Sequence, residues 1–215
     1  MGRARGTGAL SISDANVPVI GLIGGVASGK SVVAAELARL GAAVLDADRA
    51  GHEVLSLPEV TSAIRERWGE KAFDTSGNVD RRALGRIVFE PGPAGQRELE
   101  FLEKLTHPRI GELLMRQVAG LSASGARALV LDAPVMEKSG WYGLCDRIVF
   151  VDAPREVRLA RARQRGWTEE DFAAREGAQE SLEKKQGRAD FVVDNSGSLD
   201  ETRAQVEHWW QTLFS

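Results

Sequence analysis

Eight residues near the start of the chain have the types and the spacing that bind a polyphosphate. Residues 24–31 read GGVASGKS and match the pattern G-x-x-x-x-G-K-[ST]. In such a P-loop the glycines let the backbone N–H groups wrap around phosphates, and the N-terminus of the following helix favours their negative charge. We therefore expect ATP to be bound by Gly24, Gly25, Val26, Ala27, Ser28, Gly29, Lys30 and Ser31.

The last two residues of this motif are expected to act through their side chains. Lys30 would bridge the β- and γ-phosphates, and the Ser31 hydroxyl would ligate Mg²⁺. The alternative is a glycine-rich turn with a solvated lysine. An apolar run over 17–23 and apolar residues at helical spacing over 31–40 supply the strand and the helix that the motif requires. They favour a nucleotide site, although the motif alone identifies no reaction.

The segments around the motif predict an α/β fold. Gly41 is placed to end the expected helix, and residues 42–45 follow as a second strand. Strand, turn, helix and strand form a βαβ unit, which predicts a parallel sheet covered by helices. Three more strands are expected over 128–131, 148–151 and 191–193. We therefore expect a P-loop NTPase-type, doubly wound parallel sheet of five strands, with a helical substrate-binding insert and a helical lid.

The spacing of these strands divides the chain into parts. The second and third strands are separated by helical patterns over far more residues than a crossover needs. Helices are expected over 58–68, 81–89, 94–105, 108–119 and 199–213. The expected parts are a flexible tail over 1–16, a nucleotide-binding core over 17–49, 126–159 and 189–215, a helical insert over 50–125 and an arginine-rich lid over 160–188.

Composition excludes several classes of protein. The net charge of −3, from 28 basic and 31 acidic residues, implies neither a nucleic-acid partner nor a membrane surface. A single cysteine, Cys145, excludes an internal disulfide and a cysteine zinc site. No stretch approaches the roughly 18 apolar residues of a membrane span. We expect a cytoplasmic protein without a membrane partner, either a monomer or a small homo-oligomer.

A switch GTPase is the first alternative to a kinase. Residues 48–51 read DRAG and satisfy the D-x-x-G pattern. However, the chain contains no N-K-x-D or T-K-x-D motif to bind guanine. A helical insert and an arginine-rich segment instead favour a small-molecule kinase, in which one part grips the acceptor and another closes over the γ-phosphate.

Beyond the P-loop, an ordered set of sequence blocks lies at 44–48, 77–84 with 88–89, 105–110, 132–137, 161–165, 175–179 and 189–195. With these blocks, the sequence from about Val19 to Leu213 resembles dephospho-CoA kinases. This ordered set is far more specific than the P-loop. One departure is Val135-Met136, which lacks the aromatic bulk common there and could loosen the acceptor pocket.

The resemblance implies a reaction and its participants. It implies that the γ-phosphoryl group of ATP is transferred to the ribose 3′-hydroxyl of dephospho-CoA, giving CoA and ADP with Mg²⁺ as cofactor. It also implies that the helical insert grips the CoA moiety and that the segment 160–188 is the lid. A P-loop kinase for another hydroxyl acceptor, such as a nucleoside or sugar, and a non-catalytic nucleotide-regulated binding protein remain open.

Asp48 is the candidate general base. A hydroxyl that attacks phosphorus needs a carboxylate to orient it and to take its proton. Asp48 follows the second expected strand, and the resemblance places the base of the family at the same residue. Two alternatives stay open: Asp48 caps a helix that begins near Arg49, or Asp46 is the base.

Three more residues are expected to act on the phosphates or the metal. Arg161 and Arg165 are four residues apart, so they share a helix face and could neutralise charge on the transferring phosphoryl group. The alternative is a solvated basic face. Asp132 ends an apolar strand, where a carboxylate would support Mg²⁺; the alternative is a turn residue before Pro134.

The remaining candidates would contact adenine or the acceptor. Asn195 and Gly197 follow the last expected strand, a position suited to a loop around adenine. His107, with Pro108 at the expected start of a helix, would contact the substrate phosphate or ribose, or else is a loop histidine. The expected acceptor contacts also include Arg81, which the pattern does not separate from Arg82, and Glu137.

Overall fold

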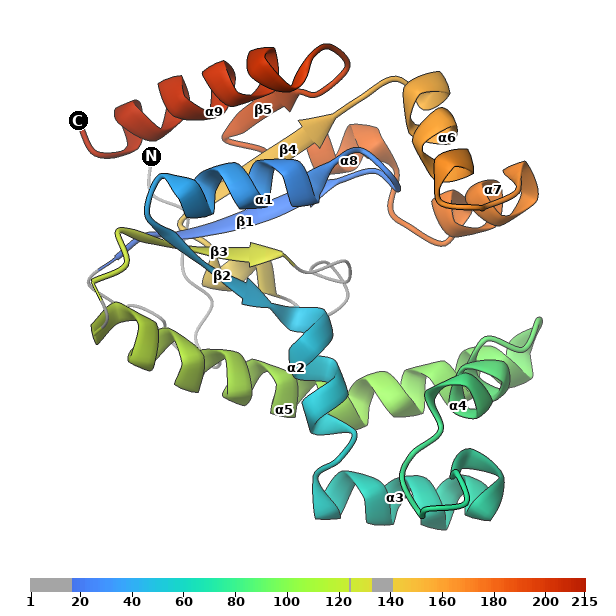
Figure 1. Ribbon diagram of the computed structural model, residues 1–215. Helices are drawn as coiled ribbons and strands as arrows, with labels where there is room; N and C mark the ends of the chain where they lie inside the picture. The colour runs from blue at the N-terminus through green and yellow to red at the C-terminus, as the bar shows by residue number, and fades with distance from the viewer. Residues whose placement is uncertain (1–16, 124, 133–140) are drawn as a thin grey trace. The chain divides into compact units, whose positions relative to one another are not determined.

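The computed structural model describes residues 17–123, 125–132 and 141–215 and shows a five-stranded parallel sheet (Figure 1). The expected tail over 1–16, Glu137 and the pair Val135-Met136 lie outside these residues. The strands are β1 (Val19–Gly24), β2 (Ala42–Asp46), β3 (Ala128–Asp132), β4 (Arg147–Asp152) and β5 (Phe191–Asp194), in the order β2-β3-β1-β4-β5. The predicted α/β class and the doubly wound parallel sheet are confirmed.

The central strand, β1, carries the P-loop at its carboxyl end. It pairs in parallel with β3, where Leu22 is opposite Asp132, and with β4, where Gly24 is opposite Val151. All six residues of β1 are buried, which is expected of a strand covered on both faces. Since all five strands run in one direction, their carboxyl ends meet at the edge from which the P-loop leaves the sheet.

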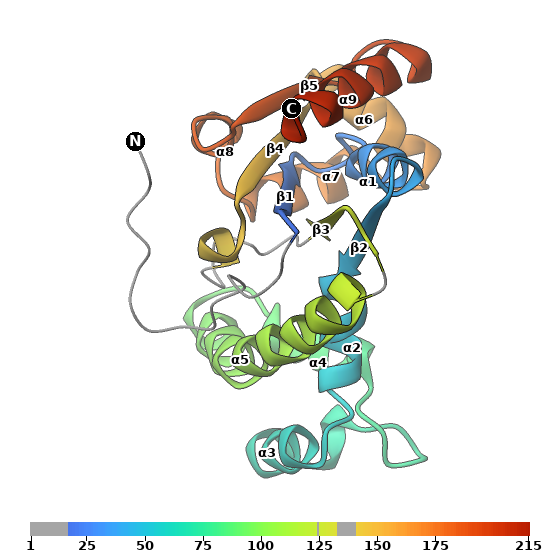
Figure 2. The same ribbon diagram turned by 90° about the vertical axis from the view of Figure 1, so that its left-hand side faces the viewer.

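Two helices cover one face of the sheet. The helix that follows the P-loop, α1 (Lys30–Arg39), and the last helix, α9 (Leu199–Leu213), lie side by side (Figures 1 and 2). Leu37 of α1 and Trp209 and Trp210 of α9 are buried together with Ile20 of β1 in one apolar core. This packing fixes the helix whose N-terminus faces the phosphate site.

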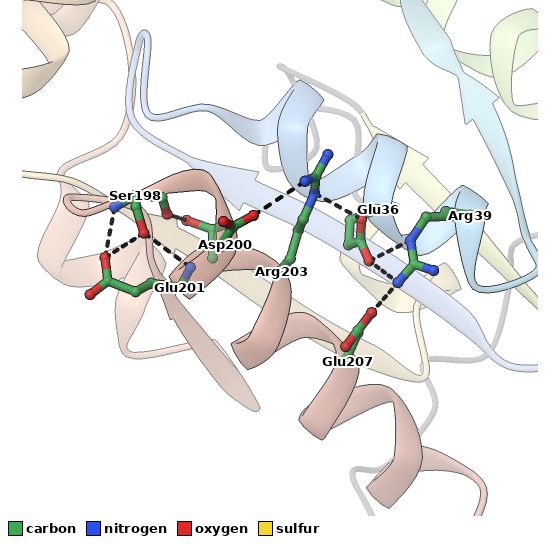
Figure 3. A network of polar contacts seen from close by, with 8 residues as sticks. Glu36, Arg39, Ser198, Asp200, Glu201, Arg203 and Glu207 are labelled. Carbon is green, nitrogen blue, oxygen red and sulfur yellow. Dashed lines mark hydrogen bonds and ion pairs between the residues drawn. The ribbon is translucent and has the colours of Figure 1, made fainter.

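A polar network also joins α1 to α9 (Figure 3). The side chain of Glu36 is only 4% exposed and accepts hydrogen bonds from Arg39, and Arg203 of α9 lies 3.7 Å from its other oxygen. Arg39 also pairs with Glu207 of α9. The buried carboxylate is therefore held by one arginine from each helix.

The segment expected to be a lid forms three short helices. These are α6 (Arg155–Gln164), α7 (Glu169–Gly177) and α8 (Leu182–Gln186). A small apolar core joins α6 and α7 through Leu159, Ala162 and Phe172, and Val26 of the P-loop is buried in the same core. The segment and the P-loop thus share packing.

Residues 47–116 form a compact helical unit of their own. It contains α2 (Ala47–Val54), α3 (Pro58–Trp68), the 3₁₀ turn η2 (Gly69–Ala72), α4 (Arg81–Val88) and most of α5 (Pro93–Ala123). A further 3₁₀ turn, η3 (Trp141–Leu144), precedes β4. Within the unit, Glu98 of α5 accepts two hydrogen bonds from Arg67 and one from the Trp68 indole. None of the described helices is long and apolar enough to cross a membrane.

The prediction of two helices over 94–105 and 108–119 was wrong. The structure has one helix, α5, with Pro108 inside it, so Pro108 does not begin a helix. Proline lacks an N–H group and normally breaks a helix interior. Here the neighbouring carbonyl groups find side-chain donors: Thr106 Oγ1 bonds to the carbonyl of Leu102, and Arg109 bonds to that of Leu105. Neither bond reaches the carbonyl of Lys104, which an N–H group at position 108 would have bonded, yet α5 continues to Ala123.

Candidate nucleotide-binding site

The P-loop has the backbone conformation that its glycines allow. It leaves β1 at Gly24 and enters α1 at Lys30, and both Ala27 (φ 57°) and Gly29 (φ 97°) have left-handed backbone angles. A Cβ atom on Gly29 would lie 2.0 Å from Nδ2 of Asn195, and one on Gly24 would lie 2.6 Å from the carbonyl oxygen of Val151. Alternating left-handed residues turn successive N–H groups toward one side, which forms an anion-binding nest.

Two of the predicted site residues meet at the carbonyl group of Ser28. It accepts a 2.7 Å hydrogen bond from Nδ2 of Asn195 and a 3.1 Å bond from Arg161. The second terminal nitrogen of Arg161 donates to the carbonyl oxygen of Asn195 at 2.8 Å. In this structure Arg161 and Asn195 therefore support the P-loop backbone. Their contacts with ATP stay a prediction.

Lys30 lies near a carboxylate and a second cation. Burial lowers the pKa of Lys30, the negative charge of Asp132 opposes that shift, and the positive charge of Arg165 adds to it. Its ammonium group donates to the carbonyl oxygen of Gly25 at 3.4 Å. Lys30, Asp132 and Arg165, predicted separately, are thus close enough to act on one another electrostatically. A desolvated ammonium interacts more strongly with a bound phosphate than a solvated one.

Two buried cations at the P-loop were not singled out from the sequence. Arg158, of which 3% is exposed, donates to the carbonyl oxygens of Ala153 at 3.0 Å and Val26 at 3.4 Å, and pairs with Glu176 at 2.6 Å. Lys185, of which 7% is exposed, donates to the carbonyl oxygen of Gly24 at 3.4 Å. Both belong to a run of charges that is typical of a solvated face. The one local signal was the position of Arg158 one turn before Arg161 on the same helix.

The predicted metal ligands offer hard oxygen atoms. Ser31 is the second residue of α1 and is exposed, and Asp132 is half-buried at the carboxyl end of β3. Among the described residues no group of three or more histidine, cysteine, aspartate or glutamate side chains could hold a metal by itself. A hydroxyl and a carboxylate suit Mg²⁺, which commonly takes its other ligands from water and substrate phosphates.

Asp48 lies in the first turn of α2, directly after β2. Since α2 begins at Ala47, Asp48 is inside the helix, and the alternative that it caps a helix beginning near Arg49 was wrong. Asp46 ends β2, and its Cα is paired in register with that of Asp132. The side chains of Asp46 and Asp48 lie outside what the structure describes, so the choice of base stays a prediction.

The candidates in the helical unit and near the last strand have structural contacts. Arg81 begins α4 and contacts His52 of α2, whereas the backbone N–H of Arg82 is capped by Asp80. His107, half-buried, is an interior residue of α5.

Gly197 lies beside the carboxylate of Glu201, which takes part in the capping box at the start of α9. A Cβ atom on residue 197 would lie 2.3 Å from an oxygen of that carboxylate, so a side chain at this position would require the carboxylate to shift. Substrate contacts of Arg81, His107, Gly197 and Glu137 stay predictions.

Comparison with known proteins identifies the family. A family model described as dephospho-CoA kinase matches residues 18–201. The chain belongs to the dephospho-CoA kinase family. Kinases of this family use ATP as the phosphoryl donor, so the GTPase alternative is excluded and the kinase prediction is confirmed at the level of the family.

Relatives in the dephospho-CoA kinase family match most of the chain. A dephospho-CoA kinase of Symbiobacterium thermophilum is 43% identical, and the match covers 90% of this chain and 80% of the relative. A dephospho-CoA kinase of Bacillus licheniformis is 39% identical, and the match covers 90% of this chain and 96% of the relative. Among solved structures, TT1252 from Thermus thermophilus superposes with a TM-score of 0.80 at 32% identity, covering 93% of this chain and 98% of its own. Dephospho-CoA kinase from Campylobacter jejuni shares the fold, with a TM-score of 0.61 at 23% identity. The superposition covers 91% of this chain and 97% of that structure.

Proposed function

We propose that this protein transfers the γ-phosphoryl group of ATP to the ribose 3′-hydroxyl of dephospho-CoA, giving CoA and ADP. One observation carries the proposal: the family match over residues 18–201 includes a P-loop that follows a central parallel strand and begins a helix. In the reaction the hydroxyl oxygen forms a bond to the γ-phosphorus as the bond to the β-phosphate oxygen breaks. The hydroxyl proton passes to a base.

The chain's own part in the reaction is mostly positioning and electrostatics. The N–H groups of residues 24–31 and the N-terminus of α1 would hold the polyphosphate. Lys30, which burial desolvates, would bridge the β- and γ-phosphates. Arg165, whose charge already acts on Lys30, would stabilise the transferring group. Arg161 would keep the loop in place from the opposite side of Ser28.

Mg²⁺ is proposed as the cofactor because the oxygen donors present suit it. The hydroxyl of Ser31 and the carboxylate of Asp132 are hard ligands of the kind Mg²⁺ prefers, and they are near the predicted phosphate site. When bound, the ion would neutralise charge on the phosphates. Ser31 and Asp132 would hold and orient it.

Asp48 is proposed to orient the 3′-hydroxyl and to accept its proton, and the helical unit to bind the rest of the acceptor. The supporting observations are the position of Asp48 directly after β2, at the edge where the strands end, and the family match. Arg81 and His107 of the helical unit are proposed acceptor contacts. Glu137, which lies outside both that unit and the described residues, is the third.

The test is ADP release with Mg·ATP and a set of acceptors. Dephospho-CoA is compared with adenosine, a pyrimidine nucleoside and gluconate, and the product is identified by mass spectrometry. Asp48→Asn is measured beside Asp46→Asn, its neighbour in the same segment. We expect turnover with dephospho-CoA alone, reduced on the order of a thousandfold in Asp48→Asn and much less in Asp46→Asn.

Each other outcome has a definite meaning. Turnover with a different acceptor would keep the phosphoryl transfer and refute the substrate. ATP binding without turnover on any acceptor would favour a nucleotide-regulated binding protein. A larger loss in Asp46→Asn than in Asp48→Asn would move the base to Asp46.

A further inference from the structure

The carbonyl groups of the P-loop are held at every second residue by side chains from the last third of the chain. Lys185 donates to the carbonyl of Gly24, Arg158 to that of Val26, and Arg161 together with Asn195 to that of Ser28. Three of these four donors are cations. These are bonds from side chains to the backbone of a loop, so they are not part of the regular hydrogen bonding of a helix or a sheet.

The pattern has a direct consequence for the opposite side of the loop. In a trans peptide the C=O and N–H groups point in opposite directions, and no cis peptide occurs in the described residues. The three held carbonyls belong to the peptide groups that carry the N–H of Gly25, Ala27 and Gly29. When donors fix the carbonyls on one side, these N–H groups are fixed toward the other.

We propose that Arg158 and Lys185 are positioning residues for the nucleotide: they hold the Val26 and Gly24 carbonyls so that the P-loop N–H groups stay turned toward the polyphosphate. The inference rests on the nucleotide-binding part of the proposed function and not on its acceptor. Both side chains are buried and bonded to backbone, so they act on phosphate through the loop and not by touching it.

The surroundings of both cations are built to keep them in place. Glu176 of α7 balances the charge of Arg158, and the carbonyl of Ala153 fixes its Nε atom. Gln179 accepts a 2.8 Å hydrogen bond from the ammonium group of Lys185. Gly25 lies close to these side chains, because a Cβ atom there would lie 3.1 Å from both Arg158 and Leu182 and would require them to shift slightly. The helices α6–α8 thus serve as a scaffold for the P-loop.

The experiment uses the full chain and measures ADP binding by calorimetry, which needs no acceptor. The test variants are Arg158→Met and Lys185→Met. The matched controls are Arg155→Met, which also loses a bond to Glu176 but contacts no P-loop carbonyl, and Lys184→Met, the exposed neighbour of Lys185. We expect the Kd for ADP to rise about tenfold in each test variant and less than twofold in the controls.

A second readout separates positioning from general damage to the fold. In the kinase assay the KM for ATP should rise about tenfold in the test variants while the KM for dephospho-CoA stays within twofold. If a methionine variant does not fold, Arg158→Lys and Lys185→Arg keep the charge and are measured instead, with a rise in the Kd for ADP of about threefold.

Two results would overturn the inference. One is ADP affinity within twofold of wild type in both folded methionine variants, and the other is an equal rise in KM for both substrates. A wild-type protein that binds ADP but does not phosphorylate dephospho-CoA would refute the proposed acceptor only, because the ADP affinities would still decide the role of Arg158 and Lys185.

Discussion

Asn195 donates its side-chain amide to the carbonyl oxygen of Ser28 at 2.7 Å, although 167 residues separate them along the chain. Its amide oxygen accepts a bond from the hydroxyl of Thr202 at 2.9 Å, which fixes which end of the amide faces the P-loop. The amide nitrogen also fills the space beside Gly29. Asn195, which directly follows β5, therefore holds the backbone of the P-loop at Ser28.

Gly29→Ala should abolish nucleotide binding. The new Cβ atom would lie 2.0 Å from Asn195 Nδ2, and the left-handed φ of 97° would add strain. We expect the affinity for ADP to fall at least a hundredfold and the unfolding temperature to drop, measured by calorimetry and circular dichroism. Asn195→Gly in the same chain removes the clash but not the strain, so it should restore stability in part. No restoration would contradict the assigned contact.

Lys30→Met should stabilise the free protein while it destroys activity. Because burial lowers the pKa of Lys30, the unfolded chain holds the proton more tightly than the folded one. The charged lysine therefore reduces the free energy of unfolding below its folded pKa, and stability recovers only as the pH rises through that value. At pH 7 without nucleotide we expect a higher unfolding temperature for Lys30→Met than for wild type, with kcat reduced at least a hundredfold.

The control for Lys30→Met is the addition of ATP. Nucleotide should raise the unfolding temperature of wild type and leave that of the variant unchanged, which reverses their order. A variant that is less stable than wild type without nucleotide would show that Lys30 contributes to the fold.

The network around Glu36 should respond differently to the loss of either charge (Figure 3). The Glu36 side chain is 4% exposed, whereas those of Arg39 and Arg203 are 55% and 48% exposed. Replacing both arginines by methionine leaves a buried carboxylate without these partners and should cost about 3 kcal/mol. Glu36→Gln leaves arginines that reach water and should cost about 1 kcal/mol. Urea unfolding measures both, and equal costs would contradict the assignment.

Glu98 should make the stability of the helical unit depend on acidity. Hydrogen bonds from Arg67, and secondarily from the Trp68 indole, lower the pKa of Glu98 below its ordinary value of 4.5. The contribution of Glu98 to the free energy of unfolding is therefore complete above pH 4.5, its ordinary pKa. This contribution is lost as the pH falls through the lower pKa of the folded protein. We expect Glu98→Gln to unfold at a lower temperature than wild type at pH 7, and the difference to disappear at more acidic pH. Glu100→Gln, an exposed neighbour, should show no such pattern.

The local parts of the site were predictable from sequence, and the long-range parts were not. The motif over 24–31, its strand and its helix follow from glycine, lysine and apolar spacing within about twenty residues. The contact between Asn195 and Ser28 depends on the order of strands, which local patterns do not specify. Arg161 was expected to face phosphate, but its guanidinium group is bonded to two backbone carbonyls here.

Burial and helix continuity were the other limits. Arg158 and Lys185 belong to a charge-rich segment, and nothing in that pattern shows that Phe172 and Glu176 enclose one of them. Pro108 is a strong local signal for a helix boundary, yet α5 continues through it. For the two buried cations, tertiary contacts decided the outcome.

The pairing of β1 with β3 and β4 sets the order in which the protein matures during synthesis. The P-loop is complete at Ser31, but both neighbours of its strand and all four donors to its carbonyls are synthesised only from Ala128 onward. The nascent chain therefore carries the complete phosphate-binding motif long before it has the shape to hold ATP. We expect nucleotide to bind only after β3, β4 and these donors have been synthesised, so that it stabilises the chains that contain all of these segments.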